Sequence, residues 1–189
     1  SSRVLPESLG GYTLGVLVQT NFGGVLTMNG APVGRELGRF AFESVLVDAA
    51  AGEGEAPEGS IMIVVATDAP IYARNLERLA MRSIMGLART GSYAGNGSGD
   101  YVIAFSTDPD LRTPRESRHP VRAETLANEA MSPLFAAAAE ATEEAIYNAL
   151  LKATTVESSR GTLSAIPIES VVEVLEKYNA LDWDESLPP

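Results

Sequence analysis

The sequence predicts an α/β protein in which helices are layered on a β-sheet. Residues 12–20 and 60–66 are apolar on both alternating faces, which is typical of strands covered on each side, and residues 101–107 form another strand-length apolar run. Helical spacing of apolar residues follows at about 70–90 and in an alanine-rich segment at about 132–153. Because helices alternate with strands along the chain, we expect a sheet with helices packed on it.

Length and composition favour one domain covering residues 1–189. With 45% hydrophobic residues, the chain can build one sizeable core. Residues 49–59 are rich in Ala, Gly, Glu and Pro. The stretch 39–58 is expected to be an inserted loop, and so are residues 108–122, which contain three prolines and four arginines. Residues 180–189 are expected to form an acidic tail.

Local signals predict further elements. The glycine pair at 23–24 predicts a hairpin from the first strand into a short strand at 25–28. Asp68 stands where it would cap a helix that has Pro70 in its first turn. A last helix is expected from about Pro167. Its inward-facing residues are predicted to be Val171, Val174, Leu175 and Tyr178.

Charge and rare residues narrow the classes of function. The net charge of −11 would repel a phosphate backbone and offers no basic face to anionic lipid, and no apolar run approaches the roughly 20 residues needed to cross a bilayer. We therefore expect neither nucleic acid nor membrane as a partner, and a soluble protein of the cytoplasm or periplasm. Since there is no cysteine and one histidine, we expect no cysteine-ligated zinc and no multi-histidine metal site within this chain.

Several segments, taken in order, match one family. They are residues 1–6 (SSRVLP), 11–24 (GYTLGVLVQTNFGG), 32–37 (PVGREL), 59–70 (GSIMIVVATDAP), 87–107 (LARTGSYAGNGSGDYVIAFST), 131–149 and 165–178. Together they resemble the small subunit of the L-aminopeptidase D-Ala-esterase/amidase family, which includes the β-peptidyl aminopeptidases.

This resemblance implies a fold and a set of partners. Family members are made as one precursor that cuts itself before a serine, which then begins the smaller chain. The implied fold is a four-layer α-β-β-α sandwich that resembles the N-terminal-nucleophile hydrolases and is completed by a larger α chain. The resemblance also implies a tetramer of two-chain units, an asparagine and a tyrosine in the site from the larger chain, and no cofactor. Substrate selectivity stays open, because residues 39–58 and 108–122 depart from the family pattern.

Ser1 is the candidate nucleophile. A serine hydroxyl needs a base within hydrogen-bond reach, and histidine is scarce in this chain. A free α-amino group, with a reference pKa of about 7.7–8.0, is substantially unprotonated near neutral pH and would lie on the same residue. The chain starts with neither Met nor a signal pattern, so we expect a processed or trimmed end. A trimmed end with no catalytic role stays open as the alternative.

Asp68 is a candidate orienting carboxylate, because it ends a buried strand. In some relatives a Ser-x-acid pair orients the nucleophile; its counterparts here are Ala66 and Asp68, so the serine of the pair is missing. The alternative is a helix cap. Glu36 is a second candidate carboxylate, with a solvated or salt-bridged loop residue as its alternative.

Four further residues are candidates for binding or support. Asn21 is placed to lend an amide to the site, or to form the turn after its strand. Asn96, Ser98 and Asp100 lie among three glycines, where backbone amides can bind an anion, but the same residues are ordinary turn formers.

The leading hypothesis is an aminopeptidase or amidase that removes N-terminal residues from small peptides, amides or esters, including β-amino acids, as the resemblance implies. One alternative is an acyltransferase like the ornithine acetyltransferases, which share the architecture but use a threonine nucleophile. The other alternative is a non-catalytic assembly subunit.

Overall fold

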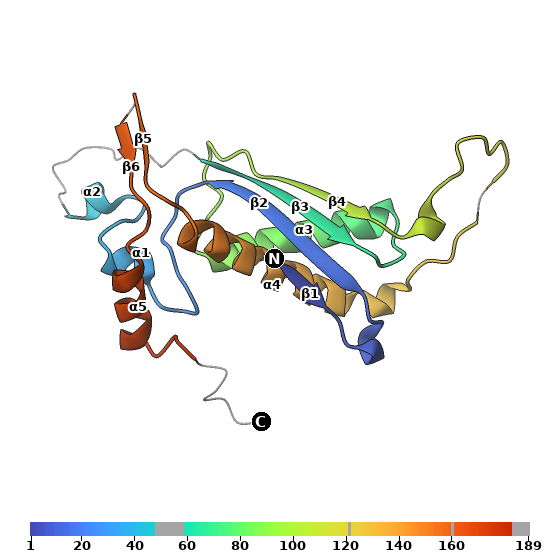
Figure 1. Ribbon diagram of the computed structural model, residues 1–189, viewed down its shortest axis with the longest axis horizontal. Coiled ribbons are helices and arrows are strands. Elements are labelled where there is room, and N and C mark those ends of the chain that lie inside the picture. Colours follow the sequence, from blue (N-terminus) through green and yellow to red (C-terminus); the bar gives the residue numbers. More distant parts are fainter. Residues whose placement is uncertain (48–58, 121, 160, 183–189) are drawn as a thin grey trace. The chain divides into compact units, whose positions relative to one another are not determined.

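The computed structural model describes residues 1–47, 59–120, 122–159 and 161–182 (Figure 1). These residues belong to two compact units, each assembled from three stretches of chain. The first unit comprises Ser1–Gln19, Met62–Leu87 and Asp100–Ala145, and the second comprises Thr20–Ile61, Ala88–Gly99 and Ile146–Pro189.

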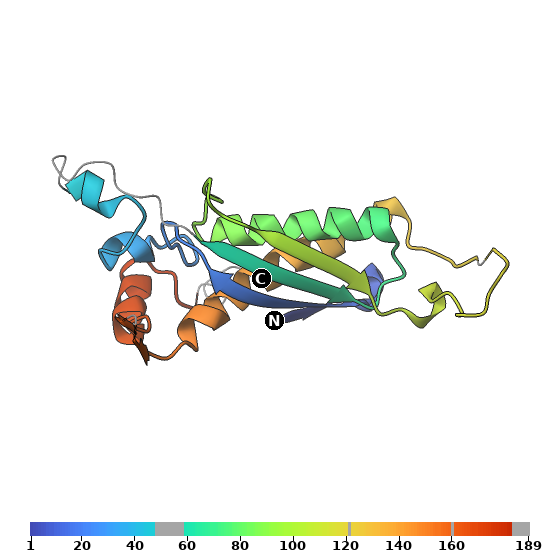
Figure 2. The ribbon, with the colours of Figure 1, turned by 90° about the horizontal axis from the view of Figure 1, so that it is seen from above.

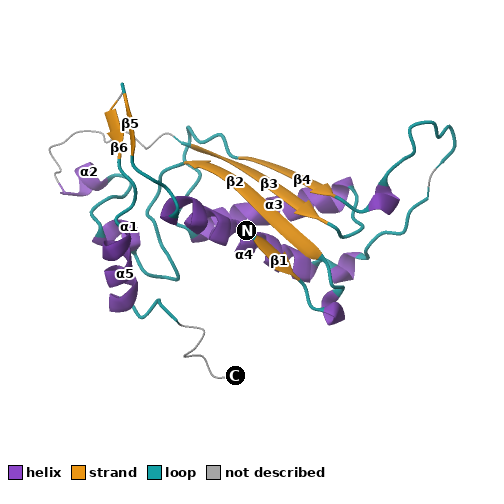
Figure 3. Cartoon of the chain, in the orientation of Figure 1, coloured by secondary structure: helices purple, strands orange, loops and turns teal. Residues whose placement is uncertain are grey.

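A four-stranded sheet is the centre of the first unit (Figure 3). Its strands, in spatial order, are β1 (Ser2–Val4), β2 (Thr13–Asn21), β3 (Ser60–Thr67) and β4 (Tyr101–Ser106). β1 runs antiparallel to β2, and β3 runs parallel to β4. The three predicted strands are confirmed, each within about one residue, and the α/β class is confirmed with them.

Two long helices, α3 (Ala73–Arg89) and α4 (Ser132–Leu151), lie on the same side of this sheet (Figure 2). Alternating strand residues point toward them, and these side chains are at most 5% exposed: Leu14 and Val16 of β2, and Ile63 and Val65 of β3. The period of two along each strand therefore defines a helix-covered face. The long helix predicted at 132–153 is confirmed.

The other face of the sheet is open in the described chain. Its apolar side chains are between 38% and 71% exposed: Val4, Leu17, Met62, Tyr101, Ile103 and Phe105. The strand register places Met62 beside Tyr101 and Val64 beside Ile103. The expectation that β2 and β3 are covered on both faces is therefore wrong for this chain alone.

Close packing of α3 on α4 depends on Gly86. A Cβ atom built there would meet the carbonyl oxygen of Ala139 and lie 2.8 Å from Cβ of Thr142. Farther along, the guanidinium of Arg82 lies 4.3 Å above the ring of Phe135. The absent side chain at Gly86 thus allows the two backbones to approach.

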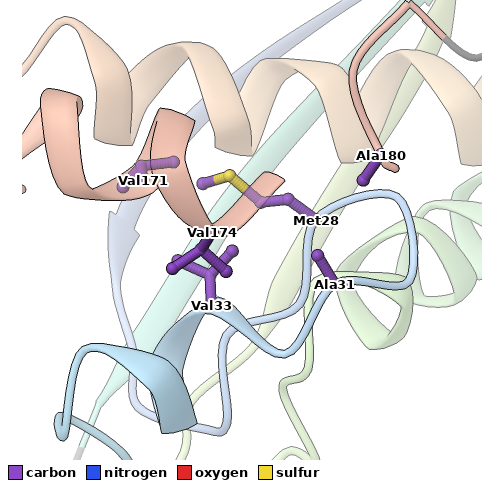
Figure 4. Close-up of a cluster of buried hydrophobic side chains, with 6 residues drawn as sticks. All are labelled: Met28, Ala31, Val33, Val171, Val174 and Ala180. Atoms are coloured by element: carbon purple, nitrogen blue, oxygen red, sulfur yellow. The ribbon is translucent and has the colours of Figure 1, made fainter. Parts of the chain in front are cut away.

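The second unit has its own apolar cluster, drawn in Figure 4. It brings α1 (Val33–Glu36) against α5 (Ile168–Lys177), and its buried members are Met28, Ala31, Val33, Val171, Val174 and Ala180. Leu175 packs against the cluster, whereas Tyr178 is 42% exposed. The predicted inward position of Tyr178 is therefore wrong: the residue caps the end of α5, and its hydroxyl donates to Glu36 (2.7 Å).

Residues 25–28 do not form the predicted hairpin strand. The amide of Val25 donates to the carbonyl of Gly91 (3.0 Å) and the amide of Thr27 donates to that of Thr90 (3.1 Å). Gly24 permits this approach, because a Cβ there would meet the carbonyl oxygen of Gly91. The segment therefore pairs with the chain after α3 instead of folding back on β2.

The predicted loops contain short helical elements. Helix α2 (Glu43–Val47) lies within 39–58, of which 48–58 are outside the described residues, and a 3-10 turn (Pro109–Leu111) lies within 108–122. At the start of the predicted tail, Ala180 is buried, and residues 183–189 are outside the described part. The remaining elements are 3-10 turns at Glu7–Leu9 and Asn128–Ala130 and the antiparallel pair β5 (Val156–Ser158) and β6 (Gly161–Leu163). Among the described residues, no helix combines the length and apolar character that a membrane span needs.

The Gly86→Ala substitution tests the helix contact. We expect a net loss of up to about 2 kcal/mol in the free energy of unfolding, because overpacking against main-chain atoms outweighs the gain in helix propensity. Urea denaturation measures it. The control is Gly15→Ala, since the nearest heavy atom to a Cβ there is 4.0 Å away. Equal stability of the two variants would contradict the close contact.

Ser83 in α3 is fully buried, and its hydroxyl has no hydrogen-bond partner among the described residues. We expect Ser83→Ala to raise the free energy of unfolding by about 1 kcal/mol, because it removes an unsatisfied polar group. Thermal denaturation checks this. Thr142→Val is the comparison, since the buried Thr142 hydroxyl donates to the carbonyl of Ala138 (2.7 Å) and its removal should give no gain.

Candidate active site

Pairing of β1 with β2 places Ser1. The Ser1 nitrogen donates to the carbonyl of Val16 (2.8 Å), and the Val16 amide donates back to the carbonyl of Ser1 (2.8 Å). Two residues that exchange both bonds lie directly opposite each other in an antiparallel ladder. The Ser1 side chain therefore shares a face with the buried Val16, and this is the helix-covered face.

Arg3 lies two residues farther along the same face, opposite Leu14. Its Nε donates to a carboxylate oxygen of Glu140 (3.3 Å), and its Nη1 makes a short hydrogen bond to Glu144. The two glutamates are one turn apart on α4 and face the strand together. Ser1, Arg3 and this pair of carboxylates form the polar cluster of the first unit.

Within this cluster, Arg3 and Ser1 both affect the pKa of Glu144. Its pKa is lowered from the ordinary value first by the hydrogen bond from Arg3 and also by a hydrogen bond with the Ser1 side chain, against the opposing effect of burial. The carboxylate is therefore ionised at neutral pH.

Sequence reasoning missed Glu144, because the alanine-rich helix was assigned to packing. The i, i+4 glutamate pair in α4 was visible, but its partner Arg3 lies 141 residues away in the chain.

Asp68 lies at the other end of the β1–β2 ladder. Its carboxylate accepts the amide of Thr13 (2.8 Å), and the Thr67 hydroxyl donates to the carbonyl of Thr13 (2.8 Å). Thr13 is three residues from Val16, a spacing of about 10 Å along a strand. Asp68 thus joins β3 to the start of β2 and is not brought to Ser1. The helix-cap alternative is wrong, because α3 begins at Ala73.

Glu36 forms a salt bridge with Lys177, which agrees with the alternative interpretation of Glu36 as a salt-bridged residue. Its carboxylate accepts the Lys177 ammonium (2.7 Å) and the Tyr178 hydroxyl (2.7 Å). These contacts join α1 to the end of α5, so the three residues form a structural cluster within the second unit.

Of the remaining candidates, Asn21, Asn96 and Ser98 belong to the second unit, and Asp100 belongs to the first. Asn21 ends β2 and lines a cavity of about 310 Å³ together with Phe22, Arg39 and Ile146. Asn96 and Ser98 lie in a turn in which the Ser98 amide donates to the carbonyl of Gly95 (2.8 Å). Asp100 directly precedes β4. The structure therefore brings Ser1 together with Arg3 and Glu144, and with none of the other candidates in its own unit.

A family model described as peptidase family S58 matches residues 1–164. The chain belongs to peptidase family S58. This confirms the resemblance found in the sequence, and the segments that carried it are almost all within the matched range.

A curated relative of this S58 chain is an aminopeptidase by name. The chain is 41% identical over 188 residues to the beta-peptidyl aminopeptidase BapA of Sphingosinicella microcystinivorans, covering 96% of this chain and 47% of that protein.

Two solved structures align along the chain. The L-aminopeptidase D-Ala-esterase/amidase of Ochrobactrum anthropi, described as a prototype of the serine aminopeptidases and a variant of the Ntn hydrolase fold, has a TM-score of 0.79 at 35% identity, covering 96% of this chain and 48% of that one. A beta-aminopeptidase of Burkholderia sp. has a TM-score of 0.76 at 35% identity, covering 94% and 48%. The chain thus spans about half the length of these relatives.

The Glu36 cluster predicts a pH dependence of stability. The Lys177 hydrogen bond, followed by that of Tyr178, lowers the pKa of Glu36 below its ordinary value of 4.5. A lowered folded-state pKa stabilises the protein above the unfolded value, and this contribution is lost as the pH falls below about 4.5. We expect Glu36→Gln to lower the melting temperature at pH 7, with the difference from wild type closing toward pH 3. Glu176→Gln, on α5 next to Lys177, is the control, and a pH-independent difference for Glu36→Gln would contradict the pairing.

Proposed function

We propose that this chain is the nucleophile-bearing half of an S58 aminopeptidase or amidase, and that cleavage before Ser1 frees its amino group. Ser1 then supplies both the attacking hydroxyl and, through that amino group, the base. The observation that carries the proposal is the placement of Ser1. Ser1 exchanges two hydrogen bonds with Val16, and its side chain lies on the face where Arg3 binds carboxylates of α4.

The bond to Val16 suits an amine that acts as a base. A neutral amino group has two hydrogens and one lone pair, so it can donate to the carbonyl of Val16 (2.8 Å) and still accept a proton. A strand-paired nitrogen is also held in one orientation. This arrangement replaces the histidine of a conventional triad.

The reaction proceeds through an acyl-enzyme. The Ser1 oxygen attacks the substrate carbonyl carbon, and its proton passes to the amino nitrogen of Ser1. The tetrahedral intermediate collapses, the carbon–nitrogen bond breaks, and the leaving amine takes that proton. Water then adds to the ester, giving the carboxylic acid and restoring the serine hydroxyl.

The open face of the sheet supports a second part of the proposal, the partner. A contiguous row of exposed apolar side chains on β3 and β4 needs a cover, and the S58 relatives are about twice as long as this chain. We assign this face to the remaining half of the relatives' chain, which would add the second β and α layers. That half would also supply oxyanion donors, and the resemblance implies a tetramer of such pairs.

The names of the relatives suggest the substrate class. They are beta-peptidyl aminopeptidases and an L-aminopeptidase D-Ala-esterase/amidase. We propose that this protein releases small N-terminal residues, including β-amino acids, from short peptides, amides or esters.

Blocking Ser1 tests the mechanism. In the complete two-part protein, we expect Ser1→Ala to abolish hydrolysis of an aminoacyl p-nitroanilide, and acetylation of the Ser1 amine to do the same, since each removes one of the two functions. Activity that survives both changes would refute the mechanism. Mass spectrometry after a serine-directed acylating probe should locate one adduct on Ser1. Exclusive acyl transfer to an added amine would instead indicate the acyltransferase. The absence of any adduct on Ser1 would indicate a non-catalytic subunit.

Ile103→Glu tests the partner surface. Ile103 is 56% exposed at the middle of β4, so a charge there should be buried unpaired by the second half and should weaken its co-purification strongly. Met85→Glu is the matched control, because Met85 is 59% exposed on α3, behind the opposite face of the sheet. If the two halves co-purify equally well with either variant, the open face is not their contact.

A further inference from the structure

We infer that Glu144 is a positioning residue for Ser1: it orients the hydroxyl and stabilises the cation that forms on the Ser1 amine, while Arg3 holds it in place. This inference rests on the proposed function. It assigns to a carboxylate of α4 the orienting role for which Asp68 is the candidate in the sequence.

The register of β1 on β2 is the first observation that supports the inference. Ser1 opposes Val16 and Arg3 opposes Leu14, so both side chains lie on the face that α4 covers. Residues at i and i+2 of a strand point the same way. A carboxylate that bonds Arg3 on this face is therefore within reach of Ser1 as well.

The salt bridges of Arg3 are the second observation that supports the inference. Arg3 divides its donors between Glu140 and Glu144, which tethers β1 to two consecutive turns of α4. The Ser1 side chain is among the causes that lower the pKa of Glu144, which favours Glu144 as the carboxylate beside the nucleophile.

The chemistry of Glu144 favours orientation over proton abstraction. The hydrogen bond from Arg3, then the Ser1 hydroxyl and the charge on the Ser1 amino group, lower its pKa. A carboxylate with a lowered pKa is a poor base at neutral pH but a good acceptor for a hydroxyl. Serine has one torsion with three staggered states, and one hydrogen bond is enough to select among them.

The same negative charge assists the proton transfer. When the Ser1 amine takes the hydroxyl proton it becomes a cation, and the nearby carboxylate stabilises this cation. Two effects of Glu144 are therefore separable: the acceptor oxygen orients Ser1, and the charge supports the base.

The experiment compares Glu144→Gln and Glu144→Asp with Glu140→Gln, each in the complete two-part protein with Ser1 confirmed as the new terminus by mass spectrometry. For Glu144→Gln we expect kcat to fall about tenfold to hundredfold with KM nearly unchanged. The acidic limb of its pH profile should move to lower pH, because the base loses a neighbouring negative charge. Glu140→Gln loosens the same tether, so we expect a smaller fall in kcat and a smaller displacement of the acidic limb than for Glu144→Gln.

The Asp variant separates charge from position and gives a second readout. It keeps the charge on a shorter side chain, so we expect a lower kcat with the acidic limb at its wild-type position. If the Gln variant retains wild-type kcat and limb, or if Glu140→Gln loses as much as Glu144→Gln, the inference is overturned. If wild type itself carries no probe adduct on Ser1, the proposed function has failed instead.

Discussion

The antiparallel pairing of β1 with β2 is the contact on which the candidate site depends. β1 has three residues and lies at the edge of the sheet, so its position is set by β2 and by the contact of Arg3 with α4. A slip of one residue would turn Ser1 and Arg3 to the open face and remove both from α4. The reciprocal bonds of Ser1 and Val16 therefore select the face of the sheet on which the Ser1 side chain lies.

The packing of α3 against α4 determines where the carboxylates of α4 lie relative to β1. Gly86 of α3 fits against Ala139, Thr142 and the main chain of Glu143, which immediately precedes Glu144. A displacement of α4 by the width of a methyl group would move its carboxylates relative to β1. The small residues of the two helices are thus part of the geometry of the site, although none of them contacts Ser1.

Local sequence signals predicted the parts of the fold that local forces determine. Continuous apolar runs identified β2, β3 and β4, and helical periodicity identified α4. The failures involve partners that are remote in sequence. Val25 bonds to Gly91 instead of to β2, Asp68 bonds to Thr13 instead of to the helix, and Glu144 meets Arg3 across most of the chain. Ser1 was found through the family resemblance, while the carboxylate beside it required the three-dimensional register.

Alternation along β1 divides two tasks between neighbouring residues. Ser1 and Arg3 face α4, whereas Ser2 and Val4 lie on the open face, with Val4 71% exposed. Under the proposed architecture, the odd positions serve catalysis and the even positions contact the other half of the protein. Substitutions at odd positions should then change turnover without loosening assembly, and substitutions at even positions should do the reverse. A three-residue strand can serve both because its two faces are chemically independent.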